Sequence, residues 1–176
     1  MTFTYRTYDQ QCIYYITCTV NQWNDVLTRK EYVDILLDSL RNCQKQKGLE
    51  ILSWVVMTNH IHLIISTNKD KLSDIISDFK KLTSSKIITA ITENPKESRK
   101  SRLLLLLKKE NKLKFWQDGC HPEEVTSLNS FNVKQDYIHS NPVRAGLVEK
   151  EEEYLYSSCG QVYGVKQGLL ELTNFV

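Results

Sequence analysis

Residues 50–66 read EILSWVVMTNHIHLIIS, two apolar runs that meet at Thr58-Asn59. The β-branched and aromatic residues favour strands, and so short a connection predicts an antiparallel hairpin of strands 50–57 and 60–66. Side chains alternate along a strand, so His60 and His62 share one side while Ile61 faces the other. Neutral imidazole is a common metal ligand, so the pair predicts half of a metal site. The alternative is two half-exposed histidines with hydrogen-bond partners.

The segments on either side of this hairpin predict one more strand and two helices. Residues 12–20 are rich in β-branched and aromatic side chains and predict a first strand. Thr28-x-x-Glu31 is a capping-box signal, and apolar residues at helical spacing follow until Gly48, a plausible C-terminal stop. A second amphipathic helix begins near Ser73 and extends beyond Ile87. Strand, helix, hairpin, helix is a split β-α-β pattern.

The second half of the chain is less regular. Residues 96–114 form a basic stretch around five leucines, which we interpret as another helix with solvated lysines. Residues 115–117 predict a short strand. A last helix is expected from about Ser130, capped by Asn129 or Ser130, to His139, because Pro142 disfavours a helical Asn141.

Length, net charge, cysteine content and apolar runs indicate what class of protein this is. With 176 residues, we expect residues 1–176 to form one domain with a buried core. The net charge is only +2, so an anionic partner must be met by a local patch. The five cysteines are an odd number without a C-x-x-C pair, which favours free thiols in a reducing cytoplasm. The start of the chain has no apolar leader, and the longest apolar run, 103–107, is too short for a membrane span.

A second chemical signal is the pair Tyr137 and Asn141. Four residues apart at the end of a helix, they face the same way, about 6 Å apart along its axis. A phenolate is a competent nucleophile toward a phosphodiester, and an amide oxygen is a possible metal ligand. The alternative is a helical tyrosine that only packs. His139 lies between them but points away from Asn141, so we assign it to packing or to DNA contact. His121 is interpreted as a loop histidine; the less favoured alternative is that it approaches the site.

Four ordered blocks of the chain resemble the REP-associated tyrosine transposases, relatives of small insertion-sequence transposases in the HUH single-tyrosine class. The resemblance implies that His60-Ile61-His62 is the HUH motif, Tyr137 the nucleophile and Asn141 the third metal ligand. It also implies an α+β, ferredoxin-like (RRM-like) antiparallel sheet with helices packed on one face and the catalytic helix near the C-terminus. The blocks are residues 56–64, 79–84, 115–117 and 137–148.

The same resemblance implies a reaction. Tyr137 attacks a phosphate of single-stranded DNA that carries a hairpin, and a 5′-phosphotyrosine and a free 3′-hydroxyl result. The implied cofactor is a divalent metal, Mg²⁺ or Mn²⁺, and a monomer is expected, with a dimer as the alternative. Two other functions stay open: a domesticated module that binds structured nucleic acid without cutting, and a metal phosphodiesterase that hydrolyses.

Seven residues are candidates for DNA contact. Lysines on one helix suit contacts to phosphates, and an aromatic side chain can stack on an unpaired base. The alternatives are a solvated helix face for the lysines and a place in the core for the tryptophan. The candidates are Lys80, Lys81, Ser84, Lys86, Trp116, Gln117 and Arg144.

Overall fold

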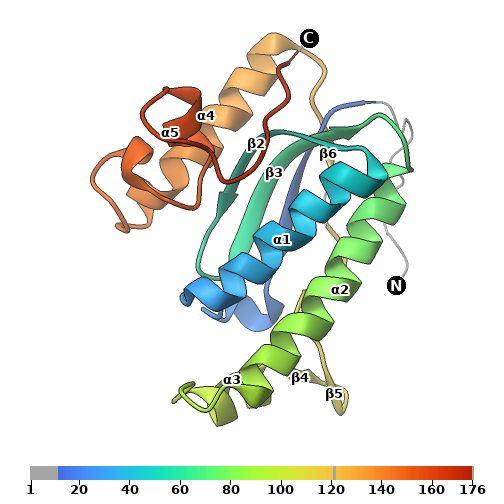
Figure 1. Cartoon of the computed structure of the whole chain (residues 1–176), viewed down its shortest axis with the longest axis vertical. Coiled ribbons are helices and arrows are strands. Elements are labelled where there is room, and N and C mark those ends of the chain that lie inside the picture. The colour runs from blue at the N-terminus through green and yellow to red at the C-terminus, as the bar shows by residue number, and fades with distance from the viewer. Residues whose placement is uncertain (1–11, 121, 176) are drawn as a thin grey trace.

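The computed structural model describes residues 12–120 and 122–175, and its centre is a four-stranded antiparallel sheet (Figure 1). The strand order β2-β3-β1-β6 places β3, which carries both histidines of the motif, in the interior of the sheet. This is the order of a ferredoxin-like sheet. The strands are β1 (Tyr14–Thr19), β2 (Leu49–Val56), β3 (His60–Thr67) and β6 (Glu123–Glu124).

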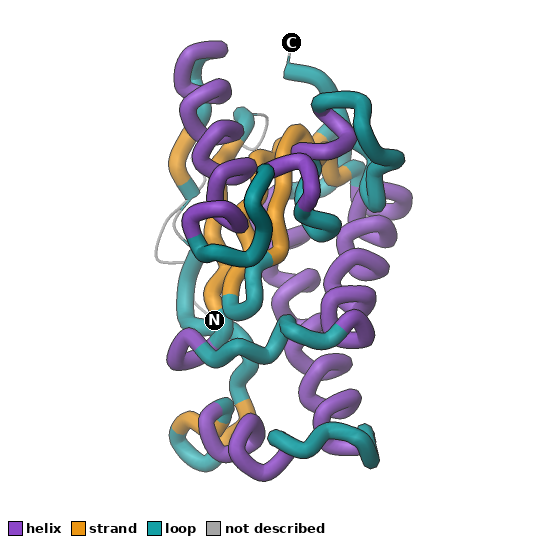
Figure 2. The backbone as a smooth tube through the Cα atoms, turned by 90° about the vertical axis from the view of Figure 1, so that its left-hand side faces the viewer, coloured by secondary structure: helices purple, strands orange, loops and turns teal. Residues whose placement is uncertain are grey.

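Helices cover both faces of this sheet. α1 (Lys30–Lys47) and α2 (Leu72–Glu93) pack against each other on one face, as expected for a ferredoxin-like fold. α4 (Leu128–Arg144) packs over β2 and β3 on the other face. Figure 2 shows the strands between these two layers of helices. The shorter elements are η1 (Asn21–Trp23), α3 (Lys100–Leu106), β4 (Lys108–Lys109), β5 (Lys112–Leu113), η2 (Glu151–Glu153) and α5 (Cys159–Val162).

The alternation of side chains divides the buried residues into two cores. On β3, Ile61, Leu63 and Ile65 face α1 and α2 in the larger core. Ile64 faces α4, where it joins a smaller core that includes Ile138. His60 and His62 have the same parity as Ile64, so both histidines face the layer of α4.

A β-bulge shapes the face under α4. The register between β2 and β3 shifts between Ile51 and Ser53. Leu52 belongs to the smaller core, and Ser53 contacts His139 of α4, so two consecutive side chains point to this face. The bulge therefore brings a polar hydroxyl under the helix.

The predicted hairpin and the first two helices are confirmed within a few residues. Gly48 ends α1 in the left-handed conformation, with φ of 72°, as its place after the helix predicted. The predicted capping box at Thr28 is wrong, because Arg29 is the N-cap and its side chain forms no capping hydrogen bond. α4 begins after Ser127, whose hydroxyl accepts a hydrogen bond from the Ser130 amide.

Two predictions for the second half of the chain are wrong. Residues 96–114 were expected to be one helix, but α3 is short and the two-stranded β4–β5 ribbon follows it. The last helix does not end at His139 but continues through Pro142 to Arg144. Proline there removes one helical hydrogen bond, and the amides of Ala145 and Leu147 still close the end by donating to Asn141 and Pro142.

No helix in the described residues is long and apolar enough to cross a membrane. His121, which the sequence placed in a loop, lies outside the described residues.

Candidate functional site

The two histidines and the tyrosine meet on the α4 face of the sheet. The rings of His60 and His62 have centroids 4.7 Å apart, and the ring of Tyr137 lies 5.4 Å from His62 in an edge-to-face arrangement. Tyr15 of β1 stacks on His62 at 5.5 Å. Residues from the middle and the C-terminal third of the chain thus form one cluster.

A chain of hydrogen bonds sets the orientation of His60. Asn59 Nδ2 donates to Asp25 Oδ1 at 3.0 Å, so the Asn59 carboxamide presents its oxygen, Oδ1, to His60 Nδ1 at 2.7 Å. Because Oδ1 can only accept, His60 Nδ1 carries the proton. His60 Nε2 then has a free lone pair, and no described residue forms a hydrogen bond with it.

His62 is held in the same way by two hydroxyls. The oxygens of Tyr15 and Thr17 each lie 2.8 Å from His62 Nδ1. This nitrogen is occupied, so Nε2 is the atom left for a ligand. Hydrogen bonding of the other ring nitrogen is what orients a metal-binding histidine.

Electrostatics keep both imidazoles neutral at pH 7. Burial, and secondarily the nearby His60, lowers the pKa of His62 to about 3. Burial also lowers the pKa of His60. Burial raises the pKa of Tyr15 to about 12, so its hydroxyl stays protonated beside His62. Metal ligation needs neutral imidazole, so the pair is in the state that binds a cation.

Tyr137 is the accessible member of the cluster. Its side chain is 39% exposed, and its hydroxyl forms no hydrogen bond to any described residue. The Arg144 guanidinium carbon lies 5.1 Å from the ring centroid. An exposed, unengaged phenol beside a cation is open to attack an incoming anion, whereas a packing tyrosine would be covered.

Asn141 lies one turn beyond Tyr137 on α4. Its side-chain nitrogen is buried and has no hydrogen-bond partner among the described residues. The two ends of a carboxamide differ only by a flip, so this orphaned position suits the amide oxygen equally well when a cation is bound. The described residues include no group of three His, Cys, Asp or Glu side chains that could hold a metal ion. A cation held by His60 and His62 would therefore need a third ligand of another type, and the Asn141 carboxamide is the candidate on α4.

Two of the predicted DNA contacts are wrong. Lys80 is buried, and its ammonium group donates to the carbonyl oxygens of Gln117 and Gly119 at 3.0 and 2.7 Å. Trp116 is also buried, and its Nε1 donates to Thr83 Oγ1 at 2.9 Å. Trp116, Gln117 and Gly119 belong to the segment after β5, which packs against α2 and so buries both Lys80 and Trp116.

The other candidates stay open to solvent. Lys81, Lys86 and Arg144 are exposed, and Ser84 and Gln117 are half-buried. His139, assigned to packing or DNA contact, is buried, and its Nε2 lies 2.9 Å from Ser158 Oγ.

Sequence reasoning missed the residues that orient the histidines. Tyr15 and Thr17 alternate along β1, and Thr17 is the register partner of His62. Their contact with His62 follows from the register of β1 against β3, which the sequence does not show. Asp25 was missed because it comes from the loop after η1, which carries no pattern.

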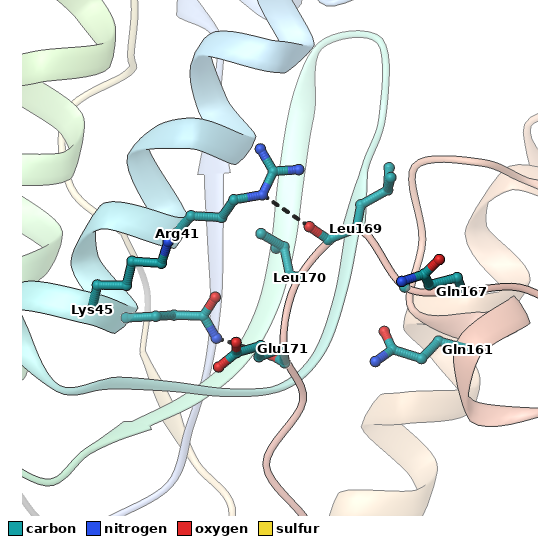
Figure 3. Close-up of a pocket in the computed structure, with 9 residues that line it drawn as sticks. Arg41, Lys45, Gln161, Gln167, Leu169, Leu170 and Glu171 are labelled. Carbon is teal, nitrogen blue, oxygen red and sulfur yellow. Dashed lines mark hydrogen bonds between the residues drawn. The ribbon is translucent and has the colours of Figure 1, made fainter.

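A separate hollow lies between α1 and the C-terminal segment (Figure 3). Arg41 Nε donates to the Leu169 carbonyl oxygen at 3.1 Å, and Gln44 Nε2 donates to that of Glu171 at 2.9 Å. None of its lining residues belongs to the histidine cluster. These contacts attach the tail of the chain to α1.

Comparison with protein families identifies the chain. A family model for the IS200-like transposases matches residues 8–141, which include His60, His62 and Tyr137. The chain belongs to the IS200-like transposase family. A comparison with curated proteins finds no match.

This transposase also resembles solved structures. One is a REP-associated tyrosine transposase bound to a REP hairpin, with a TM-score of 0.70, 18% identity, and coverage of 99% of this chain and 95% of the other. Another is a protein from Deinococcus radiodurans assigned provisionally as a transposase, with a TM-score of 0.47, 21% identity, and coverage of 78% and 95%. The first match supports the ferredoxin-like fold of the transposase.

Proposed function

We propose that this transposase cleaves and rejoins single-stranded DNA next to a hairpin through a 5′-phosphotyrosine at Tyr137. The observation that carries the proposal is the contact between Tyr137 and His62, whose rings lie 5.4 Å apart although the residues are 75 positions apart in the chain. Family membership supports the reaction type, and the likeness to a transposase bound to a REP hairpin supports a hairpin substrate.

The reaction exchanges one phosphate ester for another. The Tyr137 oxygen forms a bond to a backbone phosphorus, the bond from phosphorus to the 3′ oxygen breaks, and the phenolic proton leaves so that the 3′ oxygen ends as a hydroxyl. The reverse attack by a 3′-hydroxyl restores the phosphodiester and frees the phenol. Because the phosphotyrosine ester conserves the energy of the broken phosphodiester bond, rejoining needs no ATP.

The chain offers three ligands for a divalent metal. They are Nε2 of His60, Nε2 of His62 and the carboxamide of Asn141, all without a hydrogen-bond partner among the described residues. A bound cation would polarise the scissile phosphate and neutralise charge that develops on it. Mg²⁺ prefers oxygen ligands, so Mn²⁺ suits this mixed set at least as well.

One chain supplies the whole cluster. α4, which carries Tyr137, packs on β2 and β3 of the same chain. This arrangement supports a monomer as the active species, with exchange of α4 between two copies as the alternative.

The test is a covalent adduct. A labelled hairpin oligonucleotide is incubated with the protein and Mn²⁺, and the mixture is denatured and separated. We expect a protein–DNA band that disappears in Tyr137→Phe and persists in Tyr163→Phe, a control at another exposed tyrosine. Retarded but intact DNA would indicate a binding module, and cut DNA without an adduct would indicate a hydrolase.

A double variant, His60→Ala with His62→Ala, tests the metal ligands. We expect cleavage to be lost while binding of the hairpin persists. Loss of the folded state, followed by circular dichroism, would mean that these histidines are structural.

A further inference from the structure

Positive charge is concentrated in one segment of the chain. Residues 96–114, which we name the basic extension, contain eight lysines and arginines and two glutamates, a net charge of +6. The whole chain has a net charge of +2, so the remaining residues have a net charge of −4. This segregation gives the extension a strong local field that the rest of the molecule lacks.

Two features at the tip of the basic extension are destabilising. β4 and β5 have only two residues each, and Lys109 lies directly opposite Lys112. Like charges in such a pair are destabilising. The turn between them places Glu110 and Asn111 at φ of 49° and 61°, a region that glutamate rarely adopts. The two lysines thus lie side by side on the ribbon although their charges repel each other.

Several of these cations are free to contact a partner. Lys109 and Lys114 pair with Asp118. Arg102, Lys108 and Lys112 are exposed, and no described carboxylate forms an ion pair with them. Their charges are therefore available to an anion.

The basic extension is attached beside the histidine cluster. Its C-terminal end leads into Phe115 and Gln117, whose backbone pairs with Asn21 and Thr19 at 2.7 and 2.8 Å. Thr19 is the register partner of His60 on β3. Figure 1 shows α3, β4 and β5 beyond the end of α2, outside the sheet.

A groove continues from the ribbon along α2. Its lining includes Leu113 and Lys114 from the extension side and Lys81, Ser84 and Ser85 from α2. The exposed Lys81 and the hydroxyls of Ser84 and Ser85 on the α2 side suit a phosphate backbone that runs along this groove.

The composition of the basic extension favours paired over unpaired DNA. Residues 96–114 contain no aromatic side chain, and the neighbouring Phe115 and Trp116 are buried. Unpaired bases are held mainly by stacking on exposed aromatic rings, whereas a duplex presents phosphates outward.

We propose that the basic extension binds the backbone phosphates of the double-helical stem of the hairpin, independently of sequence, while the adjacent single strand reaches His60, His62 and Tyr137. This inference rests on the proposed function for the identity of the nucleic acid. It adds a second DNA contact to the one at the site of cleavage.

Binding is measured in a Tyr137→Phe background, so that it is separate from formation of the adduct. Fluorescence anisotropy gives the Kd for a long-stemmed hairpin over a series of salt concentrations. The test variant is Lys108→Gln with Lys112→Gln. The matched control is Lys45→Gln with Lys71→Gln, two exposed lysines at the end of α1 and the start of α2.

For the test variant we expect the slope of log K against log salt to fall by about 1.8, because each phosphate contact on a duplex contributes about 0.9. The control should keep the slope of the parent, and an unpaired oligonucleotide should bind both variants equally. An unchanged slope in the test variant overturns the proposal, as does an equal fall in the control. Binding of anionic vesicles that requires Lys108 and Lys112, with DNA binding unchanged, overturns it in favour of a membrane surface. Absence of the adduct in the wild-type protein would refute the proposed cleavage without changing these slopes.

Discussion

Asn59→Ala tests the orientation of His60 with a change that leaves both imidazoles in place. Asn59 Oδ1 is the acceptor for His60 Nδ1 at 2.7 Å, and Asp25 fixes the carboxamide from the other side at 3.0 Å. Alanine removes the acceptor, so the ring is free to rotate and its proton to move to Nε2. Loss of such a partner weakens metal binding by about 10- to 100-fold, or about 1.4 to 2.7 kcal/mol.

The assay is isothermal titration of the metal-free protein with Mn²⁺, with the His60→Ala, His62→Ala variant as the reference for lost binding. Asn68→Ala is the matched control, because Asn68 Nδ2 also donates to a carboxylate, Glu50 Oε1, but at the other end of β3. The melting temperature should change little in both variants, since both bonds are exposed. Equal affinity for Mn²⁺ in Asn59→Ala and the wild type would refute the reasoning that this hydrogen bond positions the ligand.

Two further predictions concern buried charges. Burial alone would raise the pKa of Glu97, but hydrogen bonds from Arg99 and Arg29 outweigh it and lower the pKa to about 2. The ordinary value is near 4.5, so the stabilisation, at most about 3 kcal/mol, is complete above pH 4.5 and is lost as the pH falls toward 2. Urea unfolding at pH 6 and pH 3 should show this loss in the wild type and a smaller one in Glu97→Gln; equal losses would contradict it. Lys80→Met should lower the free energy of unfolding by about 1 to 3 kcal/mol, because two carbonyl groups lose their donor, whereas Lys81→Met should change it by less than about 0.5 kcal/mol. A larger effect of Lys81→Met than of Lys80→Met on unfolding would contradict the assignment of Lys80 to the interior.

Regular patterns explain which elements of the fold were predictable. The β2–β3 hairpin and the helices α1 and α2 have long apolar repeats, and each repeat fixes both the type of element and its buried face. β6 was missed because only two residues pair with β1, too few to show alternation. The β4–β5 ribbon was missed because the leucines before it dominate the pattern, and its turn depends on backbone angles rather than on glycine.

The site was predictable only where its residues are close in sequence or carry distinctive chemistry. The sequence located His60, His62 and Tyr137, and the structure places them together. The sequence could not show that Lys80 and Trp116 are buried, because the segment after β5 that packs on α2 is irregular and its path is a tertiary feature. The same is true of the hydroxyls on β1, which reach His62 only through the register of the sheet.

The rotation of α4 about its axis is fixed by the buried side chains of Ile138 and His139. Ile138 is fully buried in the smaller core, and His139 Nε2 lies 2.9 Å from Ser158 Oγ and 3.3 Å from Ser53 Oγ. Ser53 reaches the helix only because of the bulge in β2, and the Ser158 hydroxyl also accepts from the Trp54 amide. Successive residues on a helix differ by about 100°, so with Ile138 and His139 turned inward, Tyr137 must lie at the edge of the interface, toward β3. The position of Tyr137, the proposed nucleophile, therefore depends on a bulge in β2 and on Ser158, and neither of them has a signature in the sequence.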